Sequence, residues 1–194
     1  MKGLLKKDFL EAVLGFRTLL AVLVLFAVIG VINKDGLMFL IYLVVLPVML
    51  GNSMLTVEER EKWPQFAGAL PVSRRLQTVE KYVFSLCMEA IGLVLITIVL
   101  LIRKEPDIPG ILAVFALIGL AIPAIAMPIT HKFGAEKSRY VYMVLVVATS
   151  ITFMSAPKMD VRMSISPLLV AAVVAVLYVG SILLSIAIVE KKEY

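Results

Sequence analysis

Histidine and cysteine are almost absent from this sequence, which has one of each in 194 residues. A protein metal site usually takes several His, Cys or carboxylate ligands. His131 alone therefore predicts no metal site, and we expect it to be an interfacial residue at a helix end. A single cysteine forms no intrachain disulfide. Cys87 stands inside an apolar run, which is typical of a small buried hydrophobic residue.

Charge is also scarce, at 17% of the residues, whereas hydrophobic residues make up 61%. A soluble domain has about 25% charged and about 45–50% apolar residues. Water does not solvate so much apolar surface, so the composition predicts a membrane protein. The net charge of +5 comes from basic residues that lie between apolar runs and form no contiguous patch. This distribution argues against a nucleic-acid partner.

The motifs of an enzyme are missing as well. No glycine-rich loop of the G-x-x-x-x-G-K-[ST] type is present, so the chain does not hydrolyse ATP by that route. The pair Glu58-Glu59 superficially resembles the paired glutamates of a protease, but no histidine lies on another apolar segment to complete such a site. We therefore predict no catalytic residues and no bound cofactor, and we expect any ATP and Mg²⁺ to bind a separate partner subunit.

Six apolar segments organise the chain as a single membrane domain, residues 1–194. A helix needs about 20 residues to cross a bilayer. The predicted spans are approximately residues 18–32, 37–55, 82–102, 108–130, 140–156 and 167–189. With the N-terminus inside, 14 of the 19 lysines and arginines lie on the cytoplasmic side and 5 outside. Basic residues favour the cytoplasmic side, which predicts cytoplasmic termini in an inner (plasma) membrane protein.

Residues 1–17 are mixed in character and predict a helix that lies on the cytoplasmic leaflet. Leu5, Phe9, Ala12 and Phe16 recur at helical spacing and would share one face. We expect Lys7, Asp8 and Glu11 on the opposite side, with the lysines directed to lipid headgroups. The acidic residues are atypical of a signal peptide, so we expect this segment to be retained.

One long polar stretch, residues 56–81, interrupts the apolar segments. Thr56 followed by Glu59 fits a capping box and predicts that a short helix begins there. Pro64 disfavours a helical conformation at Trp63 and would end that helix. Ser73 can cap the helix that follows.

Glu89 is the acidic residue that lies deep in a predicted span, where a carboxylate costs a few kcal/mol. It could face a groove and contact cargo or a second protomer. It could also form a structural pair with a basic residue or extend toward the interface. The sequence leaves both interpretations open.

The polar stretch resembles the first cytoplasmic loop of small bacterial ABC type-2 exporter permeases, and the segment PITHKFGAEKSRY resembles their second loop. The matching residues are Glu58, Glu59, Lys62, Trp63, Leu70, Pro71, Ser73, Arg74, Lys81 and Tyr82 in the first loop, and Pro128, Lys132, Phe133, Gly134, Lys137 and Arg139 in the second. We expect residues 131–139 to form a short basic loop.

The resemblance implies an all-α polytopic permease with six transmembrane helices, an N-terminal interfacial helix and a cytoplasmic coupling helix. It also implies two cytoplasmic ABC ATPase subunits as partners and a second permease chain, identical or related, in the same membrane. The residues expected to couple to the ATPase are Glu58, Glu59, Glu61, Lys62, Trp63 and Phe66. The cargo suggested by this resemblance is an amphipathic peptide, including toxic and antimicrobial ones. The alternative is a non-transporting membrane scaffold or an immunity protein.

Overall fold

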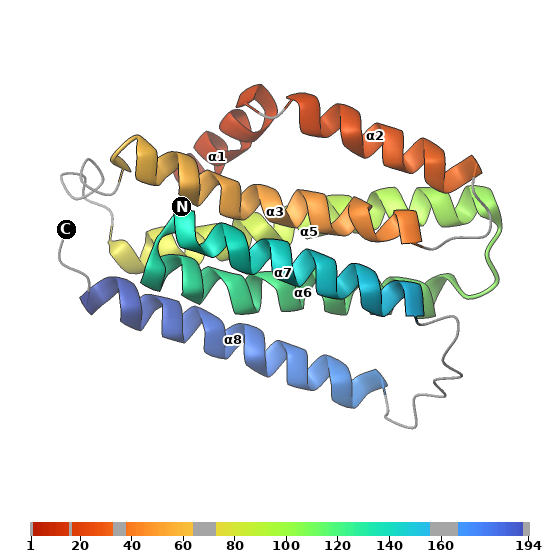
Figure 1. The fold of residues 1–194 in the computed structure, drawn as a ribbon. Coiled ribbons are helices and arrows are strands. Elements are labelled where there is room, and N and C mark those ends of the chain that lie inside the picture. The colour runs from red at the N-terminus through yellow and green to blue at the C-terminus, as the bar shows by residue number, and fades with distance from the viewer. Residues whose placement is uncertain (1, 16, 33–37, 64–72, 156–166, 192–194) are drawn as a thin grey trace.

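Seven long α-helices and no β-strand make up the described residues of the computed structural model, which are 2–15, 17–32, 38–63, 73–155 and 167–191. The helices are α1 (Lys2–Gly15), α2 (Arg17–Ile32), α3 (Met38–Arg60), α5 (Arg74–Arg103), α6 (Ile108–Phe133), α7 (Ala135–Ser155) and α8 (Pro167–Lys191). Helices α3, α5, α6, α7 and α8 form an elongated bundle in which successive helices run in opposite directions (Figure 1). Helices α1 and α2 lie along one side of it.

Four of these helices are long and apolar enough to cross a membrane, namely Phe39–Arg60, Arg74–Arg103, Ile108–Phe133 and Ala171–Lys191. Two shorter apolar helices, Ala21–Ile32 and Tyr140–Ile151, lie in the remaining predicted spans. The prediction of a polytopic, all-helical membrane protein is therefore confirmed. Length and composition support four of the six predicted crossings within the residues that the structure describes.

Helix α3 lies at the centre of the bundle, and α8 lies at its edge. In the most apolar stretch of α3, 56% of the residues are buried, whereas in that of α8 only 22% are buried. Leu40, Leu43 and Val44 of α3 are fully buried and belong to the main hydrophobic core. This core also takes side chains from α2, α5, α6 and α7, so α3 is the element against which most of the others pack.

The polar stretch does not begin with a new helix. Residues Thr56 to Arg60 are the last turns of α3, so the prediction that a capping box starts a helix at Thr56 is wrong. The chain leaves α3 at Lys62, which has a left-handed φ of 56° and donates its N–H to the carbonyl of Glu59. The predicted cap at Ser73 is confirmed, because its hydroxyl accepts a hydrogen bond of 3.3 Å from the N–H of Leu76.

The expected basic loop at residues 131–139 is instead almost entirely helical. Helix α6 continues to Phe133, α7 begins at Ala135, and Gly134 alone joins them. Gly134 has φ 86°, a conformation that residues with a Cβ rarely adopt. Its N–H donates to the carbonyl of Thr130 at 2.9 Å, and its carbonyl accepts from the N–H of Ser138 at 3.2 Å. These bonds satisfy the helix ends without a loop.

Helices α5 and α3 approach each other closely at Gly92. A Cβ at Gly92 would collide with the carbonyl oxygen of Leu43 and lie 3.1 Å from the Cα of Val44. A Cβ at Gly180 in α8 would meet nothing within 4 Å. The α3–α5 contact therefore depends on a missing side chain, a common device in membrane helix pairs.

We expect Gly92→Ala to destabilise the folded chain by about 1–3 kcal/mol, because overpacking forces the two backbones apart. Thermal unfolding in detergent, measured on the purified chain, tests this. Gly180→Ala is the matched control and should leave the unfolding midpoint unchanged or slightly raised, since alanine favours helix over glycine. An equal midpoint for both variants would contradict the close contact.

Candidate functional site

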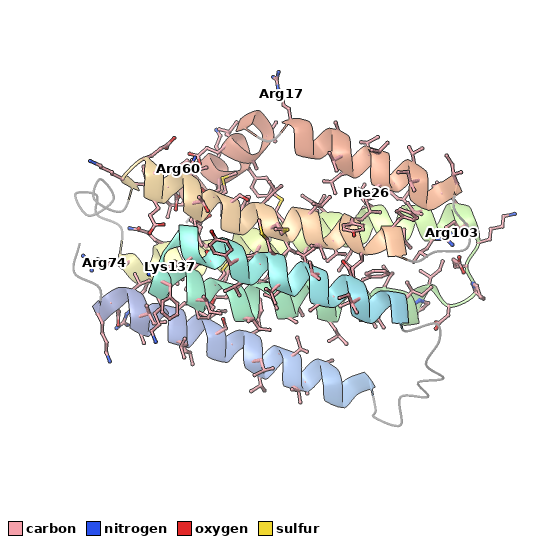
Figure 2. All side chains as sticks on the ribbon, viewed as in Figure 1. Arg17, Phe26, Arg60, Arg74, Arg103 and Lys137 are labelled. Carbon is pink, nitrogen blue, oxygen red and sulfur yellow. The ribbon has the colours of Figure 1, made fainter. Side chains whose placement is uncertain are left out.

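Basic residues gather at one end of the bundle. Arg60, Arg74 and Lys137 lie at this end, and Arg103 lies at the opposite end (Figure 2). Here α3, α6 and α8 end while α5 and α7 begin. We call this the basic end; it is the end that the sequence predicts to be cytoplasmic.

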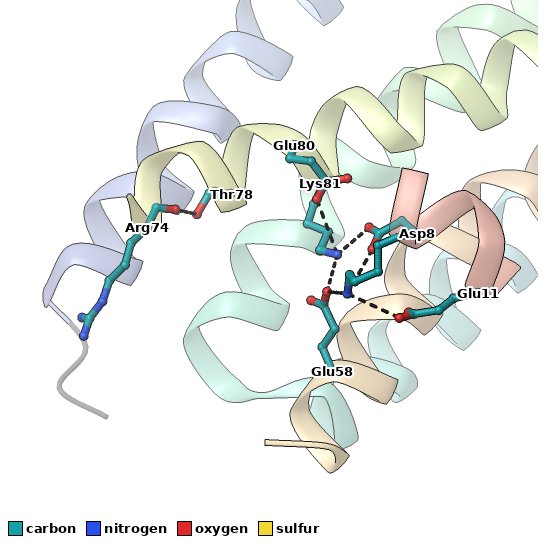
Figure 3. A network of polar contacts seen from close by, with 8 residues as sticks. Asp8, Glu11, Glu58, Arg74, Thr78, Glu80 and Lys81 are labelled. Atoms are coloured by element: carbon teal, nitrogen blue, oxygen red, sulfur yellow. Dashed lines mark hydrogen bonds and ion pairs between the residues drawn. The ribbon is translucent and has the colours of Figure 1, made fainter. Parts of the chain in front are cut away.

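Lys81 of α5 is buried at the basic end and joins three helices. Its Nζ lies 2.5 Å from Oδ2 of Asp8 in α1 and 2.7 Å from Oε1 of Glu58 in α3 (Figure 3). Its side chain is only 4% exposed, and that of Asp8 is fully buried. Breaking a buried pair by removing one charge is strongly destabilising. Lys81 therefore holds α1, α3 and α5 in one fixed arrangement.

Lys7 of α1 forms the second cationic position of this network. Its Nζ lies 2.5 Å from Oε1 of Glu58, 3.2 Å from Oδ1 of Asp8 and 3.6 Å from Oε1 of Glu11. Burial lowers the pKa of Lys7, but the hydrogen bond and the charge of Glu58 outweigh it, so the pKa is raised above its ordinary value. Lys7 therefore remains charged and bridges α1 to α3.

Carboxylates outnumber ammonium groups in this network. Asp8, Glu11, Glu58 and Glu80 surround Lys7 and Lys81. Oε1 of Glu80 and Oε2 of Glu11 have no hydrogen-bond partner within the part of the chain that the structure describes. The basic end therefore encloses more carboxyl groups than ammonium groups, and burial raises the pKa of Glu80 to about 7.

The sequence of α1 explains why Asp8 is inside. Residues three and four apart share a helix face, so Asp8 follows Leu5 and precedes Ala12 on the same side. The apolar residues of this face pack against Leu50, Met54, Phe84 and Met88, and the rings of Phe9 and Phe84 meet edge to face at 5.3 Å. The predicted opposite position of Asp8 and headgroup position of Lys7 are therefore wrong. The spacing from Leu5 to Asp8 was the signal that the sequence analysis missed.

The predicted coupling residues divide into two groups in the structure. Glu58 is buried in the network and faces Lys7 and Lys81. Glu59 is exposed at the end of α3, and its Oε1 lies 3.2 Å from where a Cβ of Gly134 would be. The two segments of the chain that the resemblance singled out therefore meet at Glu59 and Gly134.

The residues after α3 continue along the basic end. Glu61 and Lys62 are exposed. Trp63 is half-buried, and Nζ of Lys7 lies 4.3 Å from the centroid of its ring, a cation–π contact. Phe66 lies outside the described residues. The segment after α3 thus contacts α1 through Trp63. Its residues Glu61 and Lys62 face solvent.

A second polar group lies deeper, between α5 and α8. The hydroxyl of Tyr82 is 2.7 Å from that of Ser181 and 2.8 Å from that of Ser185, and the hydroxyl of Tyr178 donates to the carbonyl of Tyr82 at 3.1 Å. Glu89 follows two turns further along α5, and its side chain is buried. No lysine or arginine of the described ranges pairs with it. Within those ranges no group of three or more His, Cys, Asp or Glu side chains is placed to hold a metal ion.

Several long apolar helices, with a buried charged network at the basic end of their bundle, define a polytopic helical membrane protein. The chain belongs to a known transporter family: the family model described as "ABC-2 family transporter protein" matches residues 3–190. The resemblance read from the two polar segments is thereby confirmed at the level of the family. No curated protein and no solved structure matches the chain.

We expect Lys81→Met to destabilise the chain by about 3–5 kcal/mol, because it removes one of the two cations that Asp8 and Glu58 share and leaves their buried carboxylates with Lys7 alone. Thermal unfolding in detergent and the yield of monodisperse protein measure the effect. Arg75→Met is the control: it removes an exposed ion pair between the same helix and Glu190 of α8, and such pairs contribute little. Similar losses for both variants would contradict the dominance of the Lys81 network.

Proposed function

We propose that the chain is the permease subunit of an ATP-driven exporter, with six crossings, both termini in the cytoplasm and the basic end facing the ATPase. Membership of the ABC-2 transporter family supports this proposal. The distribution of lysine and arginine supports the orientation, since such residues favour the cytoplasmic side of a membrane. ATP and Mg²⁺ then bind and react on two separate ABC ATPase subunits.

The observation that carries the proposal is the connection of residues 61–63 to the interior of the bundle. Glu58, at the end of α3, is bonded to Lys81 of α5 and to Lys7 of α1. Lys7 also contacts the ring of Trp63. A protein that binds the segment after α3 would therefore move α1, α3 and α5 together.

The structure favours different roles within the predicted coupling set. Glu58 acts as a positioning residue, because it is buried and its charge is already shared between two lysines. Glu61 and Lys62 act as contacts for the ATPase, because they are exposed and adjacent to the fastened tryptophan. Glu59 then links this contact to the joint between α6 and α7 through Gly134.

Helix α5 is the element suited to carry the movement into the membrane. It is a single helix of 30 residues, roughly 45 Å long at about 1.5 Å per residue, which exceeds the hydrocarbon thickness of about 30 Å. Its first turns project beyond the bilayer at the basic end and carry Lys81. ATP-driven closure of the partner subunits would tilt α5 as a rigid body against α6 and α8.

The assembly in this proposal has two permease chains, identical or related, and two ATPase subunits. Export of amphipathic peptides or other amphiphiles is the proposed activity. The exposed apolar residues on α2, α5, α7 and α8 suit a chain surrounded by lipid and by a second membrane subunit.

We expect Lys62→Glu to lower retention of the ATPase subunits roughly tenfold, which corresponds to about 1.4 kcal/mol, because it reverses a charge at the contact. Co-purification from the native membrane in mild detergent, with ATPase turnover measured on the same sample, tests this. Lys104→Glu is a closely matched control: Lys62 and Lys104 are both exposed and both have φ 56°, but they lie at opposite ends of the bundle.

Retention should be unchanged in Lys104→Glu. Equal retention in both variants would place the ATPase contact elsewhere. If no ATPase accompanies the wild-type chain, the exporter role itself is wrong and a non-transporting scaffold explains the fold better.

A further inference from the structure

Glu89 lies near the middle of α5, far from either end of the bundle. Its residue is 4% exposed, and its Oε2 has no hydrogen-bond partner among the described residues. A carboxylate at membrane depth without a partner is costly, and such residues mark pathways for ions and substrates. Nothing in the structural role of α5 requires an acid here.

Helix α6 leaves space for this carboxylate. A Cβ at Gly119 would lie 2.7 Å from Cδ of Glu89, so any other residue at position 119 would displace the carboxyl group. Gly119 is near the middle of α6. The carboxyl group therefore lies between α5 and α6.

A polar stripe connects Glu89 to the basic end. Lys81, Ser85 and Glu89 are four residues apart and so lie one above the other on one face of α5. Ser85 is fully buried, and its hydroxyl also has no partner among the described residues. The hydroxyls of Tyr82, Ser181 and Ser185 line the neighbouring contact with α8. Two unpartnered polar groups thus lie one turn apart in an apolar bundle.

The stripe ends at the charged network of the basic end. Four carboxyl groups, those of Asp8, Glu11, Glu58 and Glu80, surround Lys7 and Lys81 there. Inward from Lys81, the next polar side chains on this face of α5 are Ser85 and then Glu89.

We infer that Glu89 is the binding site for the ammonium group of an exported cationic amphiphile, which enters between α5 and α6 from the basic end. An ammonium donates three hydrogen bonds, and the Glu89 carboxylate and the Ser85 hydroxyl accept them. Its charge offsets the cost of the buried carboxylate. A divalent metal ion fits less well, since it takes more oxygen ligands than one carboxylate and one hydroxyl. The inference rests on the proposed export function and names the chemistry of its cargo.

Binding to the purified full-length chain tests this site without the ATPase. The probe is a fluorescent dodecylamine with a free ammonium, and its N-acetylated, neutral form is the reference; anisotropy in a neutral detergent reports both affinities. We expect Glu89→Gln to weaken binding of the ammonium probe by about tenfold or more and to leave the acetylated probe unchanged. Equal binding of the ammonium probe to Glu89→Gln and wild type would overturn the site, as would an equal loss for both probes.

Gly119→Ala provides a second test that keeps every charge. Its Cβ occupies the space of the carboxyl group, so we expect it to weaken the ammonium probe selectively, while Gly180→Ala, where a Cβ meets nothing, should not. If Glu89→Gln does not fold, unchanged binding in Gly119→Ala overturns the inference. Loss of ATPase retention, which would refute the exporter role, is measured separately and does not alter these affinities.

Discussion

The burial of Lys81 between Asp8 and Glu58 is the interaction on which the arrangement of the basic end depends. Three helices that are distant in sequence each contribute one charge, and none of these charges is stable alone in an apolar interior. The pairing therefore specifies position: α1 must dock so that Asp8 reaches Lys81, and α3 must continue to Glu58. The last turns of α3, Thr56 to Arg60, bring the carboxylate of Glu58 next to Lys81, although the capping-box pattern predicted a new helix there.

This constraint gives α5 its place in the protein. The helix begins at the basic end, holds the charged network at Lys81, contacts α8 through Tyr82, and carries Glu89 near its middle. Gly92 then brings it against the backbone of α3. One rigid helix thus connects the surface proposed to meet the ATPase with the residue proposed to meet the cargo, which is the connection that a coupled exporter requires.

Much of the candidate site could be recognised from the sequence because its signals are local. The residue types around Glu58, Trp63 and Lys81 identified the family, and Ser73 marked the start of α5 through its side chain alone. Other features could not be recognised so easily. The helical continuity across Gly134 depends on backbone bonds to Thr130 and Ser138, and the division of Glu58 from Glu61 into buried and exposed roles depends on which helices pack beside α3.

The sequence by itself determined that the chain is a bundle of membrane helices with a basic end, because apolar length and the distribution of charge act segment by segment. Only the tertiary structure decided which charges face inward and which partners they find. Asp8, Glu58 and Lys81 form their ion pairs only after α1, α3 and α5 have packed together. The same holds for Glu89, whose environment is set by the missing side chain of Gly119 on another helix.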